Sequence, residues 1–309
     1  DDIKTAIEFA RSKHVPYFVL GGGSNVLVND NGFNGLVIKI DIGGVEYEDS
    51  SNFVYVKTGS GINWDTLVQD SVNKNLSGLE NLSLIPGQVG ASVVQNIGAY
   101  GEEVKNSVEA VKVFNIVKNK EELLTKGECN FGYRNSIFKS NQGKDLIVLS
   151  VVYKLNKNFV PNLSYQELAN KFSTSKEEIS INNVRDAVIS IRNSKLPSLL
   201  EYGTAGSYFK NPEISNIEFN KLIGDYPNCP NWKQDSNKVK VSAGFLIDKV
   251  ANMKGESVGD AHAWENQALV IVNYGNATAE DVKKLAKKIK NKIFELTKIN
   301  LENEVVEID

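Results

Sequence analysis

A run of three glycines directly after a short apolar stretch limits most strongly how this chain can fold. Residues 15–20 are typical of a strand, and the sequence GGGSN follows at 21–25. Glycine has no Cβ atom, so such a run either makes a tight turn or lets backbone N–H groups approach a phosphate. On these residues alone both interpretations stay open. Residues 26–28 read as a strand where a Rossmann fingerprint requires a helix, and a Walker lysine is absent, so these two nucleotide folds are excluded.

A second segment, residues 85–101, is also dense in glycine and small residues. Its sequence, IPGQVGASVVQNIGAYG, leaves little room for a conventional apolar face. Two such loops in one domain indicate a cofactor with a pyrophosphate group. A short helix starting near Gly90 would direct its N-terminal dipole at that group. The alternative is close packing of two backbone segments.

Elsewhere, apolar periodicity switches between helical and strand spacing, which indicates a mixture of both elements. Helices are expected around 3–10, 64–72, 184–191 and 242–250, and after a capping box at Thr278. Strands are expected at 35–40, 53–57, 108–116, 146–153, 269–273 and 304–308. The change to a polar, proline-containing stretch after residues 195–197 predicts a domain boundary near Lys195.

Composition excludes several classes of function. The 309 residues allow two or three domains, and a net charge of -3 argues against nucleic acid or an anionic membrane as partner. A small molecule is therefore expected. Cys129 and Cys229 have neither zinc nor CxxC spacing and are expected to be reduced thiols. With no membrane-length apolar run and no secretory signal, a cytoplasmic location is expected.

Three residues are candidates for chemistry, although each has an ordinary structural explanation. Arg134 beside an aromatic suits an anionic planar ligand, but for an isolated arginine a structural salt bridge is the favoured interpretation. Ser207 lies between glycine and bulky aromatics, outside any G-x-S-x-G elbow and without an evident histidine partner. Glu304 could be an ordinary solvated carboxylate on a strand, and Glu302 would be as good a candidate.

Five motifs in order along the chain resemble the UDP-N-acetylenolpyruvoylglucosamine reductase family, the MurB family. They are GGGSNVL at 21–27, LENLSLIPGQVGASVVQNIGAYG at 79–101, FGYRNSIFK at 131–139, GTAGSYFKNP at 203–212 and LENEV at 301–305. The resemblance implies an α+β fold with a vanillyl-alcohol-oxidase-type (PCMH-like) FAD-binding domain of two subdomains, followed by a C-terminal α+β substrate-binding domain. The expected ranges are 1–48, to which the tail 300–309 can return, then 49–194, and 195–299 for the substrate domain.

The same resemblance implies a cofactor and a reaction. NADPH would reduce FAD, which would reduce the enolpyruvyl ether of a UDP-sugar to UDP-N-acetylmuramate in peptidoglycan synthesis. Neither glycine loop contains His or Cys, so FAD is expected to bind noncovalently, without a metal, in a monomer. The expected FAD-binding residues are Gly21, Gly22, Gly23, Ser24, Asn25, Pro86, Gly87, Gly90, Ala91, Ser92, Asn96, Gly98, Ala99 and Gly101.

The resemblance also implies roles for the three candidates. Ser207 matches the residue that protonates an enolate-like intermediate, and Arg134 and Glu304 match those that stabilise it. Expected substrate contacts are Tyr133, Tyr165, Lys195, Asn211, Trp232 and Gln267. Tyr165 and the long stretch 211–240 resemble the family type that has a tyrosine loop and an insertion, while Trp232 stands where relatives have a tyrosine. The alternatives are a flavin-dependent alcohol or sugar oxidase and a non-catalytic flavin or sugar-nucleotide binder.

Overall fold

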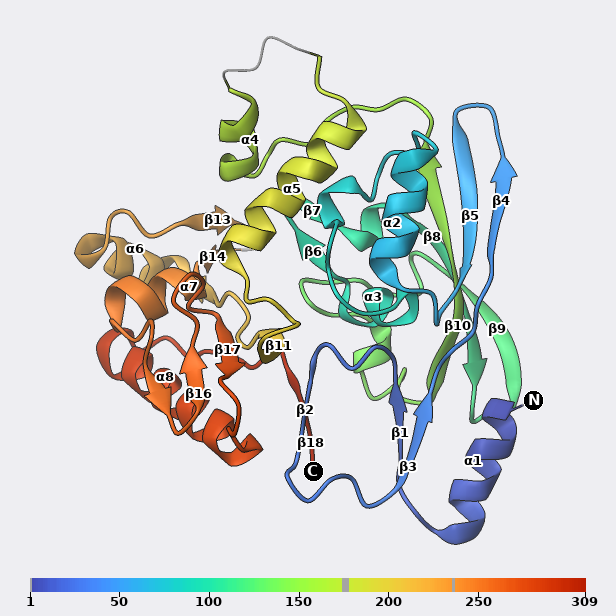
Figure 1. Cartoon of the computed structure of the whole chain (residues 1–309), viewed down its shortest axis with the longest axis horizontal. Coiled ribbons are helices and arrows are strands. Elements are labelled where there is room, and N and C mark those ends of the chain that lie inside the picture. The colour runs from blue at the N-terminus through green and yellow to red at the C-terminus, as the bar shows by residue number, and fades with distance from the viewer. Residues whose placement is uncertain (1, 174–177, 235–236) are drawn as a thin grey trace. The chain divides into compact units, whose positions relative to one another are not determined.

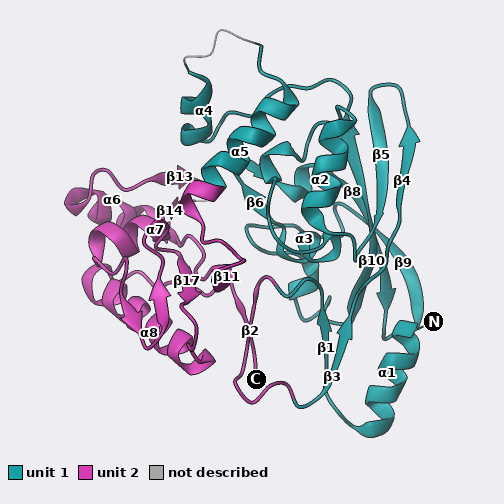
Figure 2. Ribbon diagram, in the orientation of Figure 1, with its two compact units in different colours: residues 1–23, 34–192 teal, residues 24–33, 193–309 magenta. Residues whose placement is uncertain are grey.

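A computed structural model describes residues 2–173, 178–234 and 237–309. The chain contains both helices and strands, with runs of consecutive strands between the helices (Figure 1). The chain divides into two compact units, coloured separately in Figure 2. Unit 1 comprises Asp1–Gly23 and Asn34–Arg192, and unit 2 comprises Ser24–Phe33 and Asn193–Asp309. Each unit has a hydrophobic core of its own.

The main sheet of unit 1 has five antiparallel strands in the order β4-β5-β10-β8-β9. These strands are β4 (Val45–Asp49), β5 (Phe53–Gly59), β8 (Val108–Asn115), β9 (Lys120–Thr125) and β10 (Leu146–Asn156). Helices α2 (Trp64–Asn73) and α3 (Val89–Gln95) pack their apolar side chains on this sheet. Trp64 and Val93 are among the fully buried ones, and each such side chain contributes about 1.5–3 kcal/mol.

A smaller layer of unit 1 contains the strand that precedes the first glycine loop. Helix α1 (Asp2–Lys13) packs on a parallel pair of strands, β1 (Tyr17–Leu20) and β3 (Leu36–Lys39), with Ile7 and Ile38 in one buried cluster. Because β1 ends at Leu20, the glycines start where the strand stops. Between α2 and β8 lie η1 (Glu80–Leu82), β6 (Gly98–Ala99), β7 (Glu102–Glu103) and η2 (Val104–Asn106), and η3 (Ile137–Lys139) precedes β10.

A third cluster of unit 1 forms around two helices that follow the sheet. Helix α4 (Gln166–Phe172) buries Leu168, and α5 (Ile181–Lys195) buries Val184, Val188 and Ile191 at the three- and four-residue spacing expected of one helical face. Tyr165, the residue before α4, packs on this cluster.

In the residues that the structure describes, unit 2 contains three small sheets and four helical elements. The first sheet has four strands in the order β11 (Gly203–Ser207), β17 (Val270–Asn273), β16 (Ala261–Ala263) and β15 (Ser257–Val258). The second sheet has three strands in the order β12 (Glu213–Ser215), β14 (Lys238–Val241) and β13 (Asn231–Lys233). The third sheet is the parallel pair β2 (Val26–Val28) and β18 (Val306–Ile308). The helical elements are α6 (Asn216–Asp225), α7 (Ala243–Phe245), the π-helical η4 (Leu246–Val250) and α8 (Ala279–Thr297).

Hydroxyl caps start the helices of unit 2. Thr278 Oγ1 accepts the Asp281 N–H at 3.1 Å, and the Asp281 carboxylate accepts the Thr278 N–H at 3.0 Å, so the predicted capping box of α8 is confirmed. Ser242 Oγ accepts the Phe245 N–H at 3.2 Å, which confirms the predicted cap, although the helix becomes π-helical after three residues. No helix of the described chain is both long and apolar enough to cross a membrane.

The last predicted strand was placed too early. It was expected over 304–308 and begins at Val306. Before that point the backbone pairs elsewhere, because Asn303 forms a bridge with Phe209 and the Glu304 N–H donates to the Tyr208 carbonyl at 2.7 Å. The prediction that Glu304 lies on a strand was therefore wrong, and Glu304 lies in the segment that leads from this bridge to β18.

Candidate active site

The two glycine loops meet backbone to backbone in unit 1. A Cβ atom added to Gly22 would lie 2.9 Å from the Gly87 Cα, a contact that real Cβ atoms essentially never make. A Cβ on Gly21 would lie 3.3 Å from Gln88 Oε1 and 3.5 Å from the Ala91 Cβ. Glycine is therefore required at Gly22 for close approach, and the segments predicted to share one ligand are in contact.

A third glycine-rich strand end supports this meeting point and was missed in the sequence. Strand β5 ends in Gly59-Ser60-Gly61, where a Cβ on Gly59 or Gly61 would overlap the backbone of residues 41–43. The Gly90 N–H donates to the Ser60 carbonyl at 2.9 Å, which places the start of α3 over this turn. The signal that could have revealed it is a glycine pair flanking a small residue directly after an alternating strand.

Unsatisfied polar groups gather around the same point. Thr58 Oγ1, Ser60 Oγ and Gln88 Oε1 are buried and have no hydrogen-bond partner among the described residues. Within the same ranges the Gly22, Gly23 and Gly87 amides donate no hydrogen bond to the protein. Buried polar groups are almost always paired, so these atoms indicate a ligand that supplies the partners. Phosphate oxygens and hydroxyl groups, both present in FAD, fit this set of donors and acceptors.

Two predicted cofactor residues have side chains that already bond within the protein. Ser92 Oγ donates to the Val89 carbonyl at 2.7 Å and lies 3.1 Å from the Tyr153 hydroxyl. Asn96, fully buried with φ +45°, donates from Nδ2 to the Gly132 carbonyl at 2.8 Å. These side chains shape the end of α3, and their contact with the cofactor stays a prediction.

Arg134 lies beside the second glycine segment. It occupies a tight turn with φ +49°, closed by hydrogen bonds between Gly132 and Asn135. Its Nη2 donates to the Gly98 carbonyl at 2.7 Å, and its guanidinium lies 5.4 Å from the centre of the Tyr133 ring. Two residues predicted from separate motifs, Arg134 and Gly98, are therefore adjacent, and Tyr133 accompanies them.

Ser207 and Glu304 are brought together in unit 2. Ser207 ends β11 after Gly206, whose φ is +76°, and a register shift between Thr204 and Ser207 interrupts the pairing with β17. The next residue, Tyr208, accepts the Glu304 N–H at 2.7 Å. Asn25 Nδ2 donates to the Glu304 carbonyl at 3.2 Å, so the end of the GGGSN sequence joins this arrangement.

Of the predicted substrate residues of unit 2, two meet the same helix and two lie separately. Asn211 Oδ1 accepts the Ala243 N–H at 2.9 Å, and Gln267 Oε1 would lie 3.1 Å from a Cβ on Gly244, so both meet helix α7. The Lys195 carbonyl accepts the Trp264 indole N–H at 2.9 Å. Trp232 is 41% exposed on β13, with the Lys240 ammonium 5.8 Å from its ring centre.

In unit 1, Tyr165 packs its ring edge-on against Tyr100, with ring centres 5.1 Å apart. Tyr100 precedes Gly101, so the expected tyrosine loop lies against the end of the second glycine segment. Burial raises the pKa of Tyr100 to about 12, although Arg192 nearby acts in the opposite direction. The hydroxyl is therefore protonated at neutral pH.

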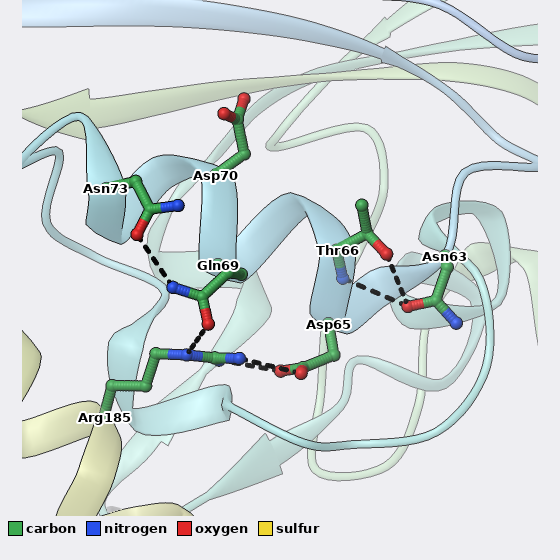
Figure 3. Close-up of a pocket in the computed structure, with 7 residues that line it drawn as sticks. All are labelled: Asn63, Asp65, Thr66, Gln69, Asp70, Asn73 and Arg185. Carbon is green, nitrogen blue, oxygen red and sulfur yellow. Dashed lines mark hydrogen bonds and ion pairs between the residues drawn. The ribbon is translucent and has the colours of Figure 1, made fainter.

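Two further features are the cysteines and a surface hollow. Cys129 and Cys229 are buried free thiols, and burial raises the pKa of Cys129 to about 12. Among the described residues, no cluster of His, Cys, Asp or Glu could hold a metal ion. A hollow of about 420 Å³ on α2 is lined by none of the predicted site residues (Figure 3). Its lining is Asn63, Asp65, Thr66, Gln69, Asp70, Asn73 and Arg185.

Known proteins resemble the chain along its whole length. A family model for an FAD binding domain matches residues 1–125, and a model for the C-terminal domain of UDP-N-acetylenolpyruvoylglucosamine reductase matches 198–308. The UDP-N-acetylenolpyruvoylglucosamine reductase of Flavobacterium johnsoniae is 41% identical over 308 residues, 99% of this chain and 90% of that protein. The chain belongs to the UDP-N-acetylenolpyruvoylglucosamine reductase family.

Other members of the MurB family agree with this assignment. The Pasteurella multocida reductase is 39% identical over 309 residues, covering 100% of this chain and 89% of that protein. The crystal structure of the Thermus caldophilus MurB reductase aligns with a TM-score of 0.65 at 29% identity, covering 98% of this chain and 90% of that chain. The predicted α+β fold with an FAD-binding domain and a MurB C-terminal domain is confirmed, as is FAD as the cofactor.

Proposed function

We propose that this chain uses NADPH and FAD to reduce the enolpyruvyl ether of UDP-N-acetylglucosamine enolpyruvate, giving UDP-N-acetylmuramate. The observation that carries the proposal is its identity of about 40% to named reductases across nearly its full length. The contact between Gly22 and Gly87, surrounded by unsatisfied polar atoms, supplies independent support for a bound dinucleotide such as FAD. The same membership makes the chain a flavin-dependent oxidoreductase.

The contacts within each unit support a set of binding roles. Gly21, Gly22, Gly23, Pro86, Gly87, Gly90 and Ala91 would hold the FAD pyrophosphate through backbone groups, and Ser24 and Asn25 continue that loop. Ser92, Asn96, Gly98, Ala99 and Gly101 complete the proposed set. FAD would bind noncovalently, because these segments contain neither His nor Cys.

The chemistry would rest on three side chains. When bound, FAD accepts hydride from NADPH and supplies it to the methylene carbon of the substrate. Negative charge then develops on the adjacent carbon and its carboxylate, where Arg134 would provide a permanent positive charge. Ser207 would donate its hydroxyl proton to that adjacent carbon, which completes the reduction of the double bond. Glu304, held near Ser207 through the Tyr208 backbone, would help to polarise the carboxylate.

Substrate recognition and domain limits are part of the same proposal. Tyr133, Tyr165, Lys195, Asn211, Trp232 and Gln267 would contact the UDP-sugar. The FAD-binding subdomains would span 1–48, with the tail 300–309, and 49–194, and the substrate-binding domain 195–299. We place the chain in the cytoplasm as a monomer that serves peptidoglycan synthesis, and thereby cell shape and division.

Separate half-reactions test the function. Purified protein should be yellow, release FAD on denaturation, and oxidise NADPH rapidly only with the UDP-enolpyruvyl sugar present. In the Ser207→Ala variant NADPH should still bleach the flavin at the wild-type rate. Reoxidation by the enolpyruvyl substrate should slow by roughly 10²–10⁴-fold, the usual contribution of a positioned acid. Anaerobic stopped-flow absorbance measures both steps.

The matched control is Ser198→Ala, which removes a hydroxyl that only accepts the Leu200 amide in an exposed turn. It should leave both half-reactions unchanged. Sugar-dependent oxygen consumption without NADPH would favour the oxidase instead. A flavoprotein that never reoxidises with the enolpyruvyl sugar would favour a non-catalytic binder. Unchanged turnover in Ser207→Ala would overturn the proton-donor role.

A further inference from the structure

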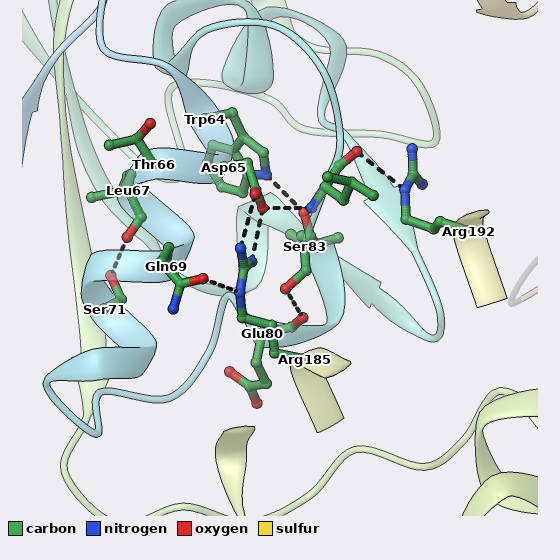
Figure 4. Close-up of polar contacts among 12 residues, drawn as sticks. Trp64, Asp65, Thr66, Leu67, Gln69, Ser71, Glu80, Ser83, Arg185 and Arg192 are labelled. Carbon is green, nitrogen blue, oxygen red and sulfur yellow. Dashed lines mark hydrogen bonds and ion pairs between the residues drawn. The ribbon is translucent and has the colours of Figure 1, made fainter. Parts of the chain in front are cut away.

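Residues 83–86 form the short connection that leads into Gly87. They are held by side chains that the proposed chemistry does not use. Trp64 and Asp65, at the start of α2, both reach it (Figure 4). The Trp64 indole N–H donates to the Leu82 carbonyl at 2.8 Å, and the Trp64 backbone N–H donates to the Gly87 carbonyl at 3.0 Å. The beginning of α2 therefore fixes this connection at both ends.

Leu84, in the middle of the connection, has a backbone conformation that suits glycine. Its φ is +58°, in the left-handed region where a Cβ atom crowds the following carbonyl. Both of its backbone polar groups are held by charged side chains. The Leu84 N–H donates to Asp65 Oδ1 at 2.5 Å, and the Leu84 carbonyl accepts Arg192 Nε at 3.2 Å. Side chains from α2 and α5 therefore hold Leu84 in a backbone conformation that is otherwise unfavourable for leucine.

Asp65 is itself fixed in place. Two guanidinium nitrogens of Arg185 donate to its two carboxylate oxygens, each at 2.8 Å, and Arg185 Nε donates to Gln69 Oε1 at 2.9 Å. Arg185 is only 5% exposed and the Asp65 side chain is 25% exposed, so this paired geometry is partly shielded from water. Burial would raise the pKa of Asp65, but hydrogen bonds from Arg185 and Leu84 lower it below its ordinary value. The acceptor for the Leu84 amide is therefore a charged carboxylate at neutral pH.

We propose that Asp65, held by Arg185, is a positioning residue that keeps Leu84 in its left-handed conformation and so sets Gly87 against Gly22 before FAD binds. The inference rests on the proposed FAD function and adds to it a pair of charges that act on the cofactor site through the backbone. A chain that must first order this connection would bind FAD more weakly, because the cost of ordering is subtracted from the affinity.

The decisive test separates backbone positioning from general stability. The double variant Asp65→Ala/Arg185→Met removes both charges together, so that neither charge is left without the other, and it takes away the acceptor of the Leu84 N–H. We expect its FAD dissociation constant, measured by quenching of flavin fluorescence, to rise about tenfold, the size of the left-handed penalty. Adding Leu84→Gly should recover most of that loss, because glycine adopts this conformation without the penalty. Leu84→Gly alone should bind FAD much as the wild type does.

A matched control removes an ion pair elsewhere in unit 1. Lys112 on β8 and Glu121 on β9 form an ion pair, and Lys112→Met/Glu121→Ala should leave FAD binding unchanged. Unchanged FAD binding in the Asp65→Ala/Arg185→Met variant would overturn the proposal. So would a loss that Leu84→Gly does not recover, since the charges would then act on stability alone.

The wild-type protein provides a second measurement that needs no variant. Leu84 is 36% exposed, yet its amide should exchange with deuterium as slowly as the buried amides of α2 even without FAD, because Asp65 holds it. Rapid exchange of that single amide in the folded apoprotein would overturn the proposal. If the wild type binds no FAD at all, the proposed function fails, whereas FAD binding that ignores these substitutions contradicts only the positioning role.

Discussion

Two acids near the second glycine loop respond to their surroundings in opposite ways. Asp65 faces Arg185 and has a lowered pKa, whereas Glu80 is almost fully buried and has no cationic partner among the residues that the structure describes. Burial raises the pKa of Glu80, and the charge of Glu102 acts in the same direction, although the Gly78 N–H that donates to its carboxylate at 2.7 Å opposes them. A charged carboxylate thus stabilises the fold at Asp65 and destabilises it at Glu80.

Glu80 should make the stability of the protein fall as pH rises. A carboxyl group with a raised pKa in the folded state contributes stability that is present below its ordinary value of about 4.5 and is lost as pH rises through the raised value. Glu80→Gln keeps an oxygen for the Gly78 N–H but cannot ionise. We expect this variant to be at least as stable as the wild type at pH 7, with a flatter dependence of unfolding free energy on pH.

Urea unfolding between pH 4 and 8 measures this difference. Glu109→Gln, on an exposed position of β8, is the control and should leave the pH dependence unchanged. A Glu80→Gln variant that loses stability at pH 7 would show that the charged carboxylate is favourable, contrary to this reasoning.

Single residues also show where sequence reasoning stopped. Gly22, Gly87 and Arg134 could be singled out because their neighbours in the chain formed recognisable motifs. Leu84 could not, because leucine gives no sign that its backbone is left-handed and its two holders, Asp65 and Arg192, are 19 and 108 residues away. Ser60 was missed for a similar reason, since its importance depends on the approach of Gly90 from a distant segment.

At the scale of elements, the long periodic segments were predictable and the short ones were not. Helices α1, α2, α5 and α8 and strands β5, β8 and β10 were predicted near their observed positions, because each has one continuous apolar face. The strands β12 to β16 and helices α4 and α6 were not predicted. They are short, and their pairing depends on partners from other segments. The misplaced start of β18 has the same cause, since the Tyr208 backbone competes for the chain before Val306.

The contact between the two glycine loops should be intolerant of a single methyl group. In Gly22→Ala the new Cβ would overlap the Gly87 backbone, which cannot move aside as a flexible side chain can. Overpacking of this kind costs about 1–3 kcal/mol. We expect FAD to dissociate at least tenfold more readily, measured by flavin fluorescence after dilution.

Gly43→Ala is the matched control, because nothing lies within 4 Å of its added Cβ and its φ is not positive. It should retain FAD like the wild type. Equal FAD retention in Gly22→Ala and Gly43→Ala would mean that the approach of Gly22 to Gly87 is not part of the flavin site.

For the whole molecule, cofactor binding should appear as stability. A ligand that binds only the folded state stabilises it by mass action, by about 2.7 kcal/mol when present at a hundred times its dissociation constant. We therefore expect FAD to raise the thermal unfolding midpoint of the apoprotein, measured by circular dichroism. Riboflavin at the same concentration should have little effect, since it lacks the pyrophosphate that the glycine loops are proposed to bind. An equal shift with both compounds would contradict that assignment.

The parallel pairing of β2 with β18 joins residues 280 positions apart in the sequence. During synthesis on a ribosome, residues 26–28 are therefore made long before residues 306–308. Unit 1 has most of its strands by residue 156, but the early segment that belongs to unit 2 has to wait until residues 306–308 have been made. An unpaired strand exposed for that time is open to wrong partners. Translation speed between residues 156 and 306, more than the strength of any single contact, should therefore influence how much nascent chain reaches the native state.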